Sequence, residues 1–221
     1  MQLLKAKVDI NKFLPHVQAY TIGSEEEGML PDAAALSFIR NSIIAFAEKS
    51  GIITTKVKVD LQCGLDTYLI EETSGETIIG VKSAKYRNYC EENCDLKWSW
   101  GNVDFQFDDD ILTICPAPKE DNEDALELEL VVIPRRDACE VDHQFYTKWF
   151  DAIIAGALKE IHLMPNYPWS SVSRADFRSR EFEDAISRAS IRRVMKGKRQ
   201  PGVMMANPDW MPNPCRSRRR W

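Results

Sequence analysis

The sequence lacks long apolar runs. No stretch approaches the roughly 18 apolar residues that a membrane-spanning helix needs, and residues 1–9 lack the apolar core of a signal peptide. These absences predict a protein that is made and used in a cytosol, without a membrane partner. The six cysteines are scattered over 221 residues, which fits thiols in a reducing compartment.

Catalytic motifs are also absent. The sequence contains no glycine-rich phosphate loop with its lysine, no G-x-G-x-x-G and no G-x-S-x-G. Cys139 and His143 form one loose pair, whereas structural zinc takes four ligands. Cys90 and Cys94 have the wrong spacing for a redox pair. We therefore predict a non-enzyme with no catalytic residue, no cofactor and no metal.

Acidic residues are plentiful, but they cluster in predicted loops. The three clusters are Glu25–Glu27, Asp108–Asp110 and Glu120–Asp124. Acid–base catalysis needs two carboxylates in different environments, and water makes the environments of loop carboxylates alike. We interpret the clusters as solvated turns, and one alternative is that acidic loops together line a shared channel.

The net charge of -5 hides an asymmetry along the chain. Residues 192–221 contain nine Lys or Arg and one acidic residue, a charge of +8, so the other residues carry -13. An acidic body with a basic tail predicts a binding partner for the tail.

Three segments have the apolar period of amphipathic helices, near 30–50, 145–164 and 173–197. In the first, Pro31 and Asp32 suit a helix start and Gly51 suits its end. Ser173 and Asp176 have the spacing of a capping box at the start of the third. The predicted buried stripes contain Ala33, Leu36, Ile39, Ile43, Phe46 and Ala47, then Phe145, Tyr146, Trp149, Phe150, Ile153, Ile154, Ala157, Leu158 and Ile161, then Phe182, Ile186, Ala189 and Arg193.

Between the first and second helices the apolar period changes to two, which is typical of strands with one wet face. The predicted strands lie near 57–61, 68–70, 77–81, 96–100, 103–107, 111–115 and 126–132. The predicted fold class is therefore α+β, a helical bundle with an inserted antiparallel β-sandwich or barrel. The predicted domains are residues 1–53 with 140–198 for the bundle, 54–139 for the β domain and 199–221 for an extended basic arm.

The C-terminal arm cannot form a regular helix, because four prolines follow Gln200. Tryptophan and methionine anchors among arginines suit a docking strand, bound to a neighbouring subunit or a different protein; the alternative is a disordered tail. The predicted docking residues are Arg199, Trp210, Met211, Arg216, Arg218, Arg219, Arg220 and Trp221.

The order of these elements resembles that of head-to-tail adaptor (connector) proteins of tailed bacteriophages, similar to the tail tubular protein A group. The resemblance covers most of residues 11–198 and rests on hydrophobic and small-residue signatures. These are Asp32–Leu36, Ile39–Arg40, Ile43 and Phe46, then Ala152, Ala155–Leu158, Met164–Pro165 and Pro168–Trp169, then Phe182, Ala185–Ile186, Ala189 and Gly197.

The resemblance implies a structural virion protein that joins the portal above to a tail or nozzle protein below. It implies a homo-oligomeric ring, usually dodecameric, through which double-stranded DNA passes during genome ejection. The helical bundle would form the ring wall and the arm would reach the portal. The expected location is the phage neck or tail, after assembly in the host cytoplasm.

Two other functions compete with the adaptor. The arginine-rich tail could serve a nucleic-acid-binding module, although the acidic body argues against it. An enzyme with a site on the β domain ranks last, and a deep pocket with converging polar side chains would distinguish it.

Overall fold

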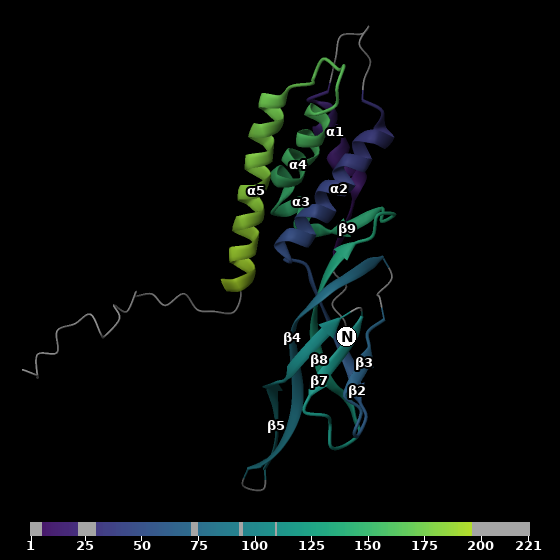
Figure 1. The fold of residues 1–221 in the computed structure, drawn as a ribbon, viewed down its shortest axis with the longest axis vertical. Coiled ribbons are helices and arrows are strands. Elements are labelled where there is room, and N and C mark those ends of the chain that lie inside the picture. The colour runs from purple at the N-terminus through teal and green to yellow at the C-terminus, as the bar shows by residue number, and fades with distance from the viewer. Residues whose placement is uncertain (1–5, 22–29, 72–74, 93–94, 109, 196–221) are drawn as a thin grey trace, which may run out of the picture.

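The structure is a computed structural model that describes residues 6–21, 30–71, 75–92, 95–108 and 110–195. Of residues 87–92, 95–100 and 195 it describes the backbone. Helices gather at one end of the molecule and the two larger sheets at the other, with β9 beside the helices (Figure 1). The helices are α1 (Leu14–Gln18), α2 (Asp32–Ser50), α3 (His143–Thr147), α4 (Phe150–His162) and α5 (Val172–Met195), with a 3-10 turn at Ile10–Phe13. The strands are β1 (Lys7–Asp9), β2 (Thr54–Leu61), β3 (Thr67–Leu69), β4 (Glu76–Glu92), β5 (Asp95–Asn102), β6 (Asp104–Asp108), β7 (Ile111–Cys115), β8 (Asn122–Pro134) and β9 (Glu140–Asp142).

The predicted α+β class with antiparallel sheets is confirmed. One sheet has the order β2-β8-β4-β5 and another β3-β7-β6, and every pairing in them is antiparallel. Neither sheet closes into a barrel within the described ranges, so the barrel alternative is wrong for that part of the chain. A two-stranded sheet, β1 with β9, joins the N-terminal segment to the start of α3.

Helices α2, α4 and α5 pack on one another around a shared aromatic core. Phe46 lies at its centre, with ring centroids 5.2 Å from Trp149, 6.3 Å from Phe145 and 6.1 Å from Phe182. Helix α4 is the central element, since Ala152–Leu158 are all buried. Edge-to-face and tilted aromatic contacts such as these contribute about 0.5–1.5 kcal/mol each beyond their buried area.

A close approach of the three helices occurs at Gly156 of α4. A Cβ built there would lie 2.8 Å and 2.9 Å from ring carbons of Phe182 on α5, and 3.0 Å from Cβ of Ser42 on α2. Only a residue without a side chain fits this point without displacing its neighbours. The glycine therefore sets how closely α2 and α5 pack against α4.

The first predicted helix is confirmed as α2, but its buried stripe is shifted. Ile39, Ile43, Phe46 and Ala47 are buried as predicted, whereas Ala33 is exposed and Leu36 half-buried. Gly51 ends the helix with a left-handed φ of 55°, and its N–H donates to the carbonyl of Ala47 at 2.8 Å.

The prediction of one continuous helix over 145–164 is wrong. The chain forms α3 and α4, separated by Lys148 and Trp149, which have φ values of -116° and -125°. The apolar stripe continues across this break, because Phe145, Trp149 and Ile153 are all buried. The periodicity therefore gave no sign of the interruption.

The predicted capping box at Ser173 and Asp176 is also wrong, because the third helix begins earlier. Helix α5 starts at Val172, and the N–H of Arg174 donates to Oγ of Ser171 at 3.4 Å. Asp176 instead pairs with Arg180 at 2.7 Å, one turn further along. Of the predicted stripe, Phe182, Ile186 and Ala189 are buried and Arg193 is half-buried.

Candidate functional site

The predicted docking site falls on the C-terminal arm. All of its residues lie outside the described residues: Arg199, Trp210, Met211, Arg216, Arg218, Arg219, Arg220 and Trp221. The turn of α5 that precedes the arm is described.

Two arginines hold the C-terminal end of α5. The guanidinium of Arg192 lies over the Trp149 ring, 5.1 Å from its centroid, in cation–π geometry. The guanidinium of Arg193 lies against the backbone of Gly51, where α2 passes toward β2, so a Cβ at Gly51 would collide with its Nη1. The end of α5 nearest the sheets (Figure 1) is thus fixed to α2 and to the start of α4.

The sequence marked Arg193 only as part of a stripe and gave no indication of these two contacts. A helix with arginines in its last turn is ordinary. Gly51 is the one signal that could have predicted the Arg193 contact, because a glycine at the end of a helix leaves its backbone accessible to a neighbouring side chain.

A groove of about 870 Å³ lies between α1, α4 and α5. Its lining includes Ala19, Tyr20, Phe150, Ile154, Arg178 and Arg188. Arg178 donates to Glu181 at 2.8 Å and lies 5.3 Å from the Tyr20 ring centroid, and Arg188 pairs with Asp184 at 3.1 Å. The groove therefore offers apolar surface with a rim of paired charges, which suits a protein segment better than an ion.

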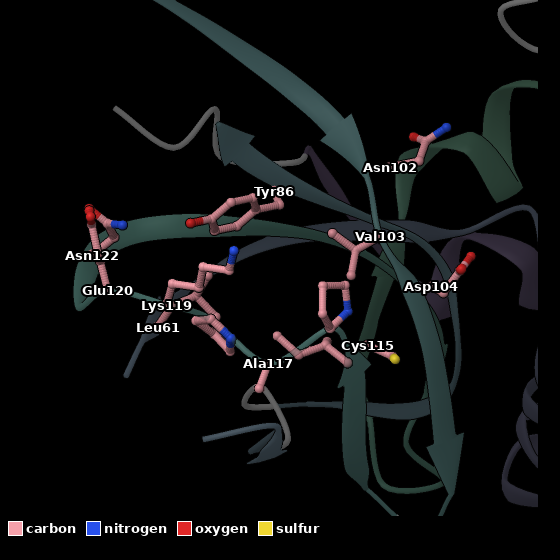
Figure 2. Close-up of a pocket in the computed structure, with 13 residues that line it drawn as sticks. Leu61, Tyr86, Asn102, Val103, Asp104, Cys115, Ala117, Lys119, Glu120 and Asn122 are labelled. Carbon is pink, nitrogen blue, oxygen red and sulfur yellow. The ribbon is translucent and has the colours of Figure 1, made fainter. Parts of the chain in front are cut away.

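The β domain has an open hollow of about 880 Å³ between its two sheets, shown in Figure 2. Tyr86 and Val103 lie on one side of it and Ala117 on the other (Figure 2). Asp104, Lys119 and Glu120 add charges of both signs to its lining. Among the described residues, no hydrogen bond joins these three side chains to one another.

The acidic clusters are only partly described. Glu25–Glu27 and Asp109 lie outside the described residues. In the third cluster, Asp121 accepts a hydrogen bond from the N–H of Cys63 at 2.6 Å, and Asp124 pairs with Lys58 at 3.3 Å. These carboxylates hold the turn before β8 against the end of β2.

His162 and His16 pack within the helical part of the chain, whereas Cys63, Cys115 and Cys139 are exposed. Nδ1 of His162 is 2.8 Å from the carbonyl of Trp169, and the ring is buried. His16 packs edge-on against Phe150, with centroids 4.7 Å apart. Across the described ranges no three His, Cys, Asp or Glu side chains gather as metal ligands.

A row of ion pairs crosses the wet face of the larger sheet. Nζ of Lys56 lies 2.8 Å from Glu127, and Nζ of Lys82 lies 2.7 Å from Glu129, which also accepts from Thr54. The hydrogen bond from Lys56 to the Glu127 carboxylate raises the pKa of that lysine above 10.5. These pairs align β2, β8 and β4 and provide no site of their own.

Among the described residues, no helix is both long and apolar enough to cross a membrane. Compared with the known protein families and with curated proteins, the sequence matched none of them.

Proposed function

We propose that this chain is a structural virion protein, a head-to-tail adaptor of a tailed bacteriophage, and not an enzyme. It assembles with copies of itself into a ring, a dodecamer by resemblance, with the portal protein above and a tail or nozzle protein below. Double-stranded DNA passes through the ring when the genome is ejected. The protein belongs to the phage neck or tail and is assembled in the host cytoplasm.

The observation that carries the proposal is that helices far apart in the sequence pack against one another. Helix α2 contacts α4 and α5, although the strands β2 to β9 separate them in sequence. We interpret the three helices as a bundle and the two larger sheets as an open sandwich inserted into it. That is the arrangement expected of an adaptor subunit, with a wall element and a projecting domain.

The outward surface of α5 supports assembly with further copies. Phe177, Ile191 and Val194 are more than half exposed, with exposed fractions of 57%, 54% and 59%. The groove beside α5 adds further apolar surface at Tyr20 and Phe150. A head-to-tail ring gives each subunit two different neighbours, so both surfaces can be covered.

The held end of α5 supports the docking role of the arm. Arg192 and Arg193 contact Trp149 and Gly51, so the last described turn of α5 has a defined position in each subunit. Exposed ion pairs contribute only about 0–1 kcal/mol each. Binding to the portal therefore comes chiefly from Trp210, Met211 and Trp221 in pockets, while the arginines set the register.

The charge of the body supports a DNA channel. The residues before 192 carry a charge of -13. A negative channel wall repels the phosphates, so that DNA passes without sticking.

The test measures the oligomeric state of the purified chain and its binding to the portal. Native mass spectrometry or ring images are expected to show a closed ring, and deletion of Arg216–Trp221 is expected to leave the ring and the fold intact while weakening portal binding. Absence of the chain from purified virions, or unchanged portal binding after the deletion, would refute the adaptor function.

The second candidate is a nucleic-acid-binding module, favoured by the nine basic residues in 192–221. With about 4–8 phosphate contacts, the logarithm of the affinity should fall against the logarithm of salt with a slope near -4 to -7. Undetectable DNA binding near physiological salt rejects this candidate and leaves the adaptor untouched.

A further inference from the structure

The larger sheet has two outer strands, β2 and β5, each eight residues long. Strand β2 pairs with β8 and strand β5 pairs with β4, and no other described strand pairs with either. We propose that copies of this chain join through these strands, so that β5 of one copy pairs with β2 of the next. This inference rests on the proposed ring and names the backbone surfaces that build it.

The strand directions favour such a junction. The order β2-β8-β4-β5 contains four strands with antiparallel neighbours throughout, so β2 and β5 run in opposite directions. A second copy placed beside the first in the same orientation therefore presents its β2 antiparallel to the first copy's β5. Repetition of this step is a heterologous contact, which produces a ring when the rotation closes.

The hydrogen-bonding direction of β2 follows from one bond at its start. The N–H of Val132 on β8 donates to the carbonyl of Ile53 at 3.1 Å, and the register pairs Thr54 with Val131. In an antiparallel pair, bonded residues alternate along the strand. Thr55, Val57 and Val59 thus bond to β8, while Lys56 and Lys58 direct their N–H and C=O groups away from it.

The outer side of β2 is open among the described residues. The side chains of Lys56 and Lys58 are 65% and 52% exposed, and their carboxylate partners, Glu127 and Asp124, both lie on β8. Each lysine charge is paired with a carboxylate of the same subunit, which lowers the repulsion that a second strand would meet at this edge. Pairing with a second copy satisfies these backbone groups and leaves no open edge in a closed ring.

The direct test is amide hydrogen exchange on the full chain, assembled and dissociated. The amides of Lys56 and Lys58 are expected to exchange on the order of tenfold more slowly, or slower still, in the assembly. Val57 and Val59 serve as internal controls, because β8 protects them in both states. Some amides of β5 must slow as well, and slowing of β2 alone would overturn the proposal in favour of β2 pairing with β2.

Two variants at position 58 separate the effect of the lysine charge from the effect of the backbone N–H. Lys58→Ala removes the ion pair with Asp124 and keeps the amide, whereas Lys58→Pro also removes the outward N–H without touching the bonds to β8. Ring formation is expected in the alanine variant and not in the proline variant. If Lys58→Pro unfolds, the exchange measurement on the unaltered chain still decides.

The outcomes distinguish this inference from the proposed function. A ring that forms with Lys58→Pro, with unchanged exchange at Lys56, overturns the strand junction and leaves the adaptor in place. A chain that never assembles overturns both.

Discussion

Gly156→Ala is the sharpest test of the helix packing. The added methyl would lie 2.8 Å and 2.9 Å from two ring carbons of Phe182, well inside ordinary contact distance. Phe182 is 3% exposed and rests on Phe46, so its ring has little room to move. Alanine in a helix gains about 0.5–1 kcal/mol over glycine, and overpacking costs about 1–3 kcal/mol. The net expectation is a loss of about 0–2.5 kcal/mol in the free energy of unfolding, with a middle value of about 1 kcal/mol.

The assay is urea denaturation followed by circular dichroism, with Gly80→Ala as the matched control. A Cβ at Gly80 on β4 meets no atom within 4 Å, so that variant should be as stable as the parent or more stable by up to about 1 kcal/mol. The double variant Gly156→Ala with Phe182→Leu should lose less stability than the two single changes added together, by about 0.5 kcal/mol or more. Increased stability of Gly156→Ala, or additive losses in the double variant, would refute the close approach of α4 and α5.

Three further predictions concern single positions. Ala157→Trp should destabilise the fold by roughly 1–3 kcal/mol, because the position is fully buried, and an unchanged melting temperature would contradict this. Gly51→Ala should destabilise more than Gly80→Ala, since it combines a left-handed φ of 55° with a collision against Arg193, and denaturant midpoints of both variants compare the two. The raised pKa of Lys56 means that its pairing with Glu127 stabilises the fold fully below pH 10.5 and is lost as the pH rises through the higher folded pKa. Lys56→Gln should therefore lose less stability than the parent across that alkaline range, and equal losses in a pH series of denaturant midpoints would count against the pairing.

The alternation of apolar and polar residues predicted the strands well where one face of the sheet is solvent-exposed and the register is regular. Residues 57–61 and 126–132 were predicted, and they lie in β2 and β8, whose pairing runs without interruption from Thr54 to Val59. Strand β4 was predicted only over 77–81, although it extends to Glu92. Its register against β8 shifts at two points, between Ile78 and Gly80 and between Val81 and Ser83. Each shift moves the apolar positions to the other face, so a period of two cannot be followed through them.

In the helical part, the apolar spacing predicted burial better than it predicted where helices begin and end. Of the predicted stripe in 145–161, Tyr146 and Phe150 are half-buried and the other seven residues are buried, while the buried Ala152, Ala155 and Gly156 were not predicted. The spacing could not show where the helix breaks, because Trp149 keeps its place on the stripe while leaving helical geometry. The short helix α1 was missed because its five residues contain a proline and too few turns for a period to appear. The groove beside it depends on Tyr20 and Arg178, which are distant in sequence and meet only in the fold.

The positions that could not be predicted from the sequence share a physical cause. Gly156 and Gly51 matter because of what approaches them from another helix, and a sequence pattern records the residue without the neighbour. Together they hold α5 at two points, near its middle through Phe182 and at its end through Arg193. A helix held in this way has little freedom to slide or rotate against α2 and α4. The last described turn before the C-terminal arm is therefore positioned by two glycines that lie far from it in the sequence.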